Sequence, residues 1–143
     1  METATIQKEE VYSSLGHKLF YFPEQQALMM MPFGDVTEED FIATHIKVTK
    51  LAKEYGIKIM MVNETQLKSI PTKARIWLTT KFLRRPEVKA LSSQIDEMYI
   101  IKSRSVFASS LTKMMQGVVS KVFGMKFRYF TTEEEALDQL SIV

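Results

Sequence analysis

The apolar residues of this chain fall into two alternating patterns, short continuous runs and longer stretches in which apolar positions recur every three or four residues. The first pattern predicts buried strands and the second predicts amphipathic helices. The predicted strands are residues 17–22 (HKLFYF), 27–33 (ALMMMPF), 57–62 (IKIMMV), 97–102 (EMYIIK) and 125–130 (MKFRYF). Turn-forming residues 23–26 (PEQQ) separate the first two strands, and this predicts a hairpin.

The stretches with helical spacing carry their own start and stop signals. Thr37 and Asp40 form a capping box, in which the Thr37 hydroxyl accepts from the Asp40 amide and the Asp40 carboxylate reaches back. Thr132 and Glu135 form a second one, and Pro86 ends or kinks the helix that precedes it. The predicted helices, including the glycines that stop the first and third, are residues 37–56, 72–83, 106–124 and 132–140.

The predicted order is strand, strand, helix, and then three repeats of strand and helix. A hairpin followed by strand-helix units favours an α/β fold with a mixed, mainly parallel sheet flanked by four helices, because each crossover returns the chain to the same end of the sheet. The chain has 143 residues, of which 45% are hydrophobic, enough for one hydrophobic core. We therefore expect a single domain over residues 17–143, preceded by a tail of residues 1–16.

Composition excludes several classes of chemistry. The chain has no cysteine, so it has no disulfide, no thiolate nucleophile and no cysteine metal site. His17 and His45 lack metal-ligand spacing, and no phosphate-binding glycine loop is present. We expect His17 to begin a strand and His45 to be half-buried or at the surface. No catalytic residue, metal or cofactor is therefore assigned.

The start of the chain lacks the features of a signal peptide, and no window has the ~20 apolar residues of a membrane span. We therefore expect a cytoplasmic protein.

Basic residues are concentrated in the middle of the chain. Residues 65–95 hold seven Lys or Arg against one acid, Glu87. This distribution is that of a solvated helix face, or of a surface that attracts phosphate or an acidic partner. Few aromatic residues are interleaved to stack bases, and nucleic acid is therefore disfavoured. The candidate partner-facing residues are Lys73, Arg75, Arg84 and Arg85.

Ten methionines are many for this length. Methionine fills irregular cores and also lines adaptable pockets. Core filling is favoured, because most of these methionines fall on predicted strands and on a core helix stripe. The alternative is a pocket for a small apolar ligand, and its walls would be Met60, Trp77, Phe107, Leu111 and Met115.

The order of elements, the entry to the first helix (GDVTEEDF) and the closing stretch (FRYFTTEEEAL) resemble the STAS-like domains. Within that family they resemble the SpoIIAA-like group, which is related in shape to lipid-binding Sec14 domains. In the antagonists of this group a kinase phosphorylates a serine that opens a helix after a strand-end aspartate. By this resemblance Asn63 takes the strand-end position, Pro71 stands for the residue before the serine, and Thr72 stands for the serine.

The loop from Asn63 to Thr72 is therefore a candidate regulatory site, with Ser69 and Thr72 as its hydroxyl residues. A phosphate on Thr72 would meet the unpaired amides of a helix N-terminus. The other interpretation is that Ser69 or Thr72 is a plain N-cap, with proline in the first turn.

Three functional classes follow. The first is a non-enzymatic regulatory or protein-interaction module that acts on an unknown protein partner and is itself expected to be a homodimer. The second is a carrier or sensor of a small apolar or lipid ligand in the methionine-rich pocket. The third, ranked last, is an enzyme that uses Asp96, Glu97 or His45.

Overall fold

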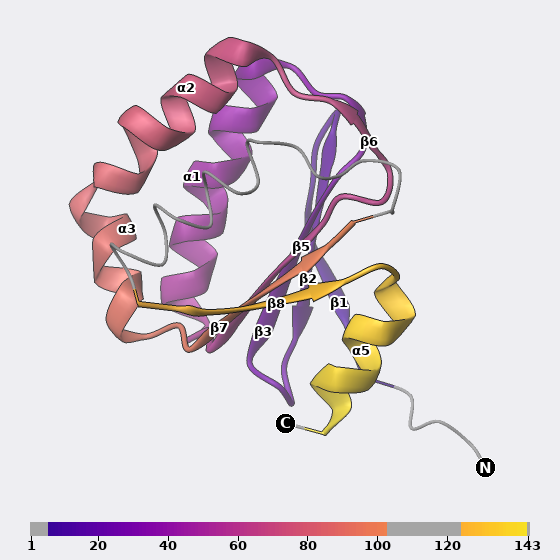
Figure 1. Cartoon of the computed structure of the whole chain (residues 1–143). Helices are drawn as coiled ribbons and strands as arrows, with labels where there is room; N and C mark the ends of the chain where they lie inside the picture. Colours follow the sequence, from indigo (N-terminus) through magenta and orange to yellow (C-terminus); the bar gives the residue numbers. More distant parts are fainter. Residues whose placement is uncertain (1–5, 103–123, 143) are drawn as a thin grey trace.

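The computed structural model describes residues 6–102 and 124–142, which form a layered α/β domain (Figure 1). Six strands make the main sheet, in the spatial order β1-β2-β3-β5-β7-β8. Their bounds are Glu9–Ser13 (β1), His17–Phe22 (β2), Ala27–Pro32 (β3), Ile59–Asn63 (β5), Glu97–Ile101 (β7) and Lys126–Phe130 (β8). Two short strands, Gly34–Asp35 (β4) and Leu67–Ser69 (β6), form a second, parallel pair.

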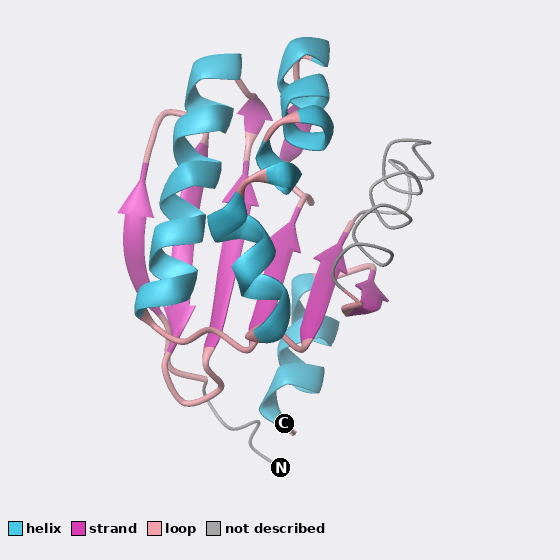
Figure 2. Cartoon of the chain, turned by 90° about the vertical axis from the view of Figure 1, so that its left-hand side faces the viewer, coloured by secondary structure: helices cyan, strands magenta, loops and turns pink. Residues whose placement is uncertain are grey.

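The helices of the described part of the chain lie on both faces of the sheet. They are Glu38–Glu54 (α1), Thr72–Thr80 (α2), Pro86–Ala90 (α3) and Glu133–Ser141 (α5), with the 3-10 turns Phe82–Arg84 (η1) and Leu91–Ser93 (η2). In Figure 2 α1, α2 and α3 lie in front of the sheet and α5 lies behind it.

The pairing of the strands confirms the predicted fold class. β1, β2 and β3 pair antiparallel, whereas β3, β5, β7 and β8 pair parallel. The turn between β2 and β3 is short, as a hairpin allows, and α1 and the α2–α3 segment supply the crossovers that parallel strands need. The sheet is mixed and mostly parallel.

The sheet starts earlier than predicted, because residues 9–13 of the expected N-terminal tail form β1 along β2. β1 is an edge strand, and only Val11 and Tyr12 in it are even partly buried. Its apolar signal is therefore weak. The short pair of β4 and β6 was missed for a similar reason, since its buried contacts are few and its strands are very short.

The helix starts agree with prediction in the bond that each threonine accepts and disagree in both carboxylates. Oε1 of Glu135 accepts from Oγ1 of Thr131 at 3.1 Å instead of reaching back to the Thr132 amide. Thr37 Oγ1 accepts from the Asp40 amide at 3.1 Å, and Thr132 Oγ1 accepts from the Glu135 amide at the same distance. The Asp40 carboxylate, however, does not reach back to Thr37. It turns to residues of the β1–β2 loop, and this difference builds the site described below.

The second and the third of the four predicted helices differ from the prediction in different ways. Instead of one helix over residues 72–83, α2 ends at Thr80 and the chain continues through η1 into α3, whose first residue is Pro86. Proline fits the first turn of a helix, where its missing amide costs nothing. The predicted helix of residues 106–124 lies almost wholly outside the described residues.

Two apolar cores, one on each face of the sheet, hold the layers together. Leu28, Met30 and Met60 face the α1–α3 layer, whereas Met29 and Met61 belong to the core under α5. Neighbouring methionines on one strand thus serve opposite faces, as the alternation of strand side chains requires. These methionines are buried core residues, and Met30 and Met60 also border the cavity described below. No helix of the described part of the chain is long and apolar enough to cross a membrane.

Candidate functional site

A cavity of about 210 Å³ lies between the sheet and the layer of α1, α2 and α3. Most of its wall is apolar, and the strands contribute one side and the helices and 3-10 turns the other. Representative wall residues are Met30, Met60, Val62, Leu83, Met98 and Phe127. A hollow of this kind between layers is the usual location of a small-molecule site.

Several polar residues of the wall, though not Thr49 of α1, lie where the parallel strands end. Glu64 follows the last residue of β5, and Arg75 lies in the first turn of α2. His17 is the first residue of β2. Because β2 runs antiparallel to β3, His17 lies opposite Pro32 at the carboxyl end of β3. Ligands of open α/β sheets bind outside the carboxyl ends of the strands, and these polar groups lie at that edge.

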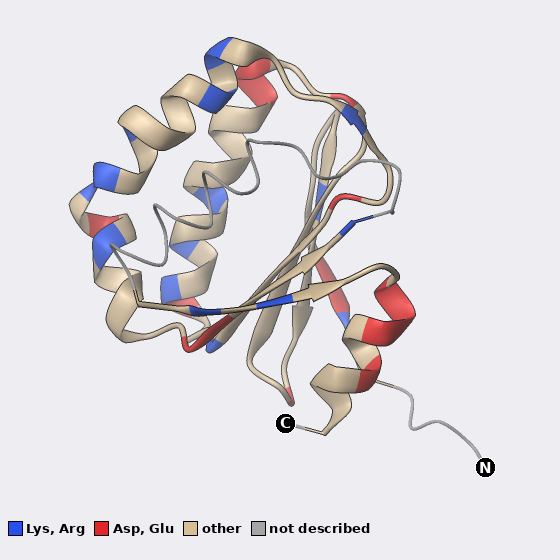
Figure 3. Ribbon diagram, viewed as in Figure 1, with Lys and Arg blue, Asp and Glu red and all other residues tan. Residues whose placement is uncertain are grey.

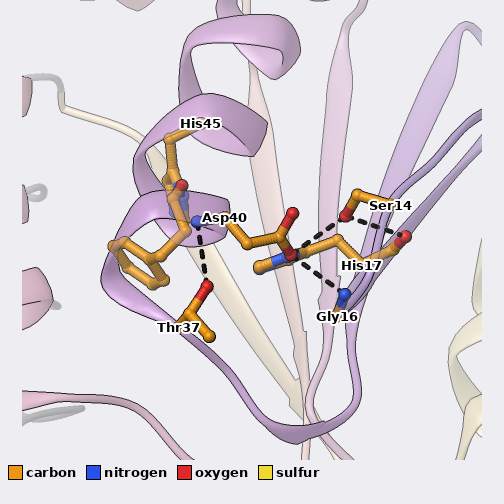
Figure 4. Close-up of polar contacts among 7 residues, drawn as sticks. Ser14, Gly16, His17, Thr37, Asp40 and His45 are labelled. Carbon is orange, nitrogen blue, oxygen red and sulfur yellow. Dashed lines mark hydrogen bonds and ion pairs between the residues drawn. The ribbon is translucent and has the colours of Figure 1, made fainter.

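Asp40 fixes the orientation of His17 (Figure 4). Its Oδ2 atom lies 2.7 Å from Nδ1 of His17, and it also accepts from Oγ of Ser14 and from the amide of Gly16, both at 3.0 Å. A Cβ atom at Gly16 would lie 3.2 Å from the same oxygen, a tight contact that a side chain at position 16 would relieve only by a small shift of Asp40. Three donors from one loop therefore converge on one carboxylate oxygen.

The protonation state of this pair follows from burial and hydrogen bonding. His17 is 0% exposed, and burial lowers its pKa although the hydrogen bond and the charge of Asp40 act in the opposite direction. For Asp40 burial acts to raise the pKa, but the hydrogen bonds from His17, Ser14 and Gly16 outweigh it and the pKa is lowered. At neutral pH Asp40 is an anion and His17 is neutral, with its proton on Nδ1. Its Nε2 atom is buried and has no hydrogen-bond partner among the described residues.

His45 lies beside this pair and is buried, at 8% exposure, rather than half-buried or at the surface as predicted. Its ring is 6.5 Å from the ring of His17, and its Nδ1 atom lies 2.8 Å from the carbonyl oxygen of Phe41. Trp77 and Phe82 pack against it edge-on, at 6.2 and 5.3 Å between ring centroids. Burial lowers the pKa of His45 to about 4, so it is neutral at pH 7.

The two histidines are distant in sequence, and sequence analysis did not connect them. They meet because β2 begins next to the first turns of α1. No local spacing reports such a contact. Within the described residues no group of three or more His, Cys, Asp or Glu side chains could hold a metal ion.

The candidate regulatory loop has one residue in a structural role and two hydroxyls at the surface. Asn63 is 1% exposed; its Nδ2 donates to Oε1 of Glu133 at 2.7 Å, and its Oδ1 accepts from the amide and hydroxyl of Thr65. Ser69 donates to Oδ1 of Asp35 at 2.7 Å. Neither Ser69 nor Thr72 is the N-cap of α2, because Pro71 takes that position and offers no side-chain bond.

The pocket predicted from the methionines coincides with the cavity at one residue. Met60 is part of the wall. Trp77 is not part of the cavity wall and packs instead between Phe41 and Phe82. The remaining three residues, Phe107, Leu111 and Met115, lie outside the described residues.

The predicted basic residues divide between the surface and the cavity. Lys73 and Arg84 are exposed on the outer side of the helical layer, where Figure 3 shows basic residues along α2 and α3. Arg85 is partly exposed and bonds Glu87 at 3.0 Å. Arg75 instead lines the cavity, and its Nε atom is buried with no hydrogen-bond partner in the part of the chain that the structure describes. The residue as a whole is partly exposed, so Arg75 borders the surface as well as the cavity.

The three residues suggested for an enzyme do not converge. Asp96 is exposed and immediately precedes β7. Glu97 is the first residue of β7 and bonds Arg128 at 3.3 Å. Both acids therefore lie at the amino edge of the parallel strands. His45 lies in the cavity wall, and neither acid does.

Comparison with known proteins identifies the fold. No family model and no curated protein sequence matches the chain. The structure is similar to the phosphorylated form of the Bacillus cell fate determinant SpoIIAA, with a TM-score of 0.54 and 15% identity over 95% of this chain and 99% of that one. It is also similar to the unphosphorylated form of the anti-sigma factor antagonist SpoIIAA, with a TM-score of 0.55 and 16% identity over 97% and 100%.

A third similar structure is an uncharacterised protein of the DUF3478 family from Shewanella loihica PV-4, which has a SpoIIAA-like fold. Its TM-score is 0.52, with 19% identity over 98% of both chains. All three likenesses extend over nearly the whole of each chain. The chain is therefore an α/β domain with a SpoIIAA-like fold.

Proposed function

We propose that this chain is a regulatory, non-enzymatic module that binds an acidic protein partner through the outer side of α2, η1 and α3. The observation that carries the proposal is the charge of this segment. From Thr72 to Ala90 the only acid is Glu87, and the exposed basic residues are Lys73, Lys81, Arg84 and Lys89. A similar fold occurs in SpoIIAA, an anti-sigma factor antagonist, and this supports a protein partner.

The same surface has an apolar centre. Ile76 is 54% exposed on α2, one helical turn from Lys73 and from Thr80. Protein interfaces commonly place an apolar contact inside a polar rim, in which the rim charges steer the encounter and the buried contact supplies affinity. Ile76 and the surrounding lysines and arginines have this arrangement.

Charge reversal with a matched control tests the proposal. Arg84→Glu and Arg85→Glu together should reduce the recovery of the partner at least tenfold after chemical crosslinking in the native cell. Lys53→Glu and Lys58→Glu make the same change in net charge at the amino edge of the parallel strands, and they should leave recovery intact. If both double variants recover the same proteins in equal amounts, with unchanged circular dichroism, the surface is only solvated.

We also propose that the chain forms a homodimer in the cytoplasm. Among the described residues β1 and β8 are the two edge strands of the main sheet, and the edge of a sheet is a surface along which a second copy can pair. Light scattering on the purified full chain should give twice the mass of 16.6 kDa. A monomer mass at micromolar concentration, or recovery of the protein in a membrane or secreted fraction, contradicts this part.

Thr72 is the residue we propose for regulatory phosphorylation. It is exposed, it is the first residue of α2, and this helix has no side-chain cap and no acid in its first turn. The free amides and the positive end of the helix dipole favour a phosphate there. Intact-mass measurement on protein from its native cell should show an added phosphate that Thr72→Ala removes and Ser69→Ala keeps. A native protein that never carries the added mass refutes the assignment.

A further inference from the structure

Charges of opposite sign lie on the two faces of the main sheet. The segment from Thr72 to Ala90, which forms α2, η1 and α3 in front of the sheet, holds six Lys or Arg and one acid. α5, which lies behind the sheet, holds four acids and no basic residue. Figure 3 shows these two groups of charges on opposite sides of the molecule. One copy of the chain therefore carries two surfaces of complementary charge.

Within the described residues these charges are mostly without an ionic partner. On the basic surface only Arg85 has one, Glu87 at 3.0 Å, and no described residue forms an ion pair with an acid of α5. The exposed charged residues are Lys73, Lys81, Arg84 and Lys89 on the basic surface and Glu134, Glu135 and Asp138 on α5. Both surfaces therefore present charge to a partner.

The helix dipole explains only part of the acidity of α5. The acids of its first turn, Glu133–Glu135, stabilise the positive end of the helix. Asp138 lies beyond that turn, and the last turn has no basic residue to oppose the negative end. The acidic charge thus continues along the helix where helix stability does not favour it, and contact with a cationic surface accounts for this.

Each surface also has one exposed isoleucine beside its charges. Ile76 of α2 is 54% exposed, and Ile142, which follows α5, is 75% exposed. Ile76 lies one helical turn from Lys73, and Ile142 lies one turn from Asp138. A contact between the two surfaces would bury these apolar side chains among charges of opposite sign, which is the usual arrangement of a protein interface.

We propose that the acidic partner of the basic surface is α5 of a second copy of this chain. The inference rests on the proposed function, because it uses the same surface of α2, η1 and α3. The two surfaces differ and lie on opposite faces of the sheet, so each bound copy keeps one of them free and the copies join head to tail in an open chain. The contact is separate from the pairing of edge strands, and salt weakens it because exposed charges drive it.

Light scattering on the purified full chain at two salt concentrations tests the contact without any variant. At about 0.01 M salt, where the Debye length is about 30 Å, the average mass should rise with protein concentration beyond that of a dimer. At about 1 M salt, where the Debye length is about 3 Å, the mass should stay at or below that of a dimer. An average mass that is the same at both salt concentrations overturns the proposal.

Charge reversal on each surface locates the contact. The α5 variant carries Glu134→Lys and Asp138→Lys, and the basic-surface variant carries Arg84→Glu and Arg85→Glu. Each variant alone should associate at least tenfold more weakly at about 0.01 M salt, whereas an equimolar mixture of the two should associate again, because opposite charges then meet. A mixture that stays dissociated, with unchanged circular dichroism of both variants, overturns the proposal.

A matched control separates the position of the charges from their number. Glu24→Lys with Glu54→Lys changes the net charge as much as the α5 variant does, at exposed acids outside both surfaces. This control should associate as the wild type does. An equal loss of association in the control and in the α5 variant also overturns the proposal.

The basic-surface variant distinguishes this inference from the proposed function. If it recovers less of another protein from the native cell but associates with itself as the wild type does, the proposed function stands and this inference fails. If it loses only the association with itself, this inference stands and the other protein binds elsewhere. If it loses neither, both fail.

Discussion

Replacement of His45 by asparagine should remove a large part of the acid sensitivity of this fold. His45 is buried and neutral, and its Nδ1 atom bonds the Phe41 carbonyl at 2.8 Å. The amide of asparagine can donate to the same carbonyl but does not titrate. The free energy of unfolding of the variant should therefore vary less with pH than that of the wild type.

The sign and magnitude follow from the pKa of His45. It is about 4 in the folded chain against 6.5 in the unfolded one, so between these values the unfolded chain binds more protons and stability rises with pH. The contribution is complete above pH 6.5 and is lost as the pH falls towards 4. At 1.36 kcal/mol per pKa unit, protonation of the unfolded histidine lowers stability by about 2 kcal/mol between pH 8 and pH 5.

Urea unfolding from pH 8 to pH 5, with both proteins in the same buffers, measures this difference. The other groups near His45 are the same in both proteins, so their contributions cancel in the comparison. His17 titrates in both proteins, and the pKa of Asp40 is lowered below 3.8, outside the pH range used. Trp77 and Phe82 do not titrate. The wild type should lose about 2 kcal/mol more than His45→Asn over this range. Parallel pH profiles for the two proteins would refute the buried, neutral assignment of His45.

Three further substitutions test other parts of the structure by urea unfolding at pH 7.5. Asn63→Ala leaves Glu133 and Thr65 without their partner and should cost about 1–3 kcal/mol, whereas a loss under 0.5 kcal/mol would mean that these bonds contribute little. Leu28→Ala opens the core under α1 and should cost about 2–5 kcal/mol; a neutral result would place Leu28 at the surface. Thr37→Ala removes the cap of α1 and should cost about 1 kcal/mol, and an unchanged midpoint would contradict the bond to the Asp40 amide.

The strands and helices that bury a full face were predictable from the sequence. Residues 17–22 and 27–32 form the expected hairpin, because both strands are apolar enough to show their burial locally. Thr37 and Thr132 start helices as expected, because an N-cap bond spans only three residues. β1 was missed, since an edge strand with little burial carries almost no apolar signal.

The site was not predictable, because its contacts join distant residues. Asp40 has the position of a capping-box residue, yet its carboxylate bonds His17, which lies 23 residues earlier in the chain. Local spacing cannot distinguish these two uses of one carboxylate. Arg75 belongs to a run of basic residues that suggests a solvated face, and only the packing of α2 over the sheet directs it into the cavity.

The central claim is that the fold presents a neutral histidine, held by Asp40, at the polar edge of an apolar cavity. Long-range ¹H–¹⁵N NMR of the histidine-labelled chain at pH 7 tests it directly. The account predicts that His17 is neutral, with its proton on Nδ1 and with an unprotonated Nε2. A proton on Nε2 alone, or a doubly protonated ring, would contradict it.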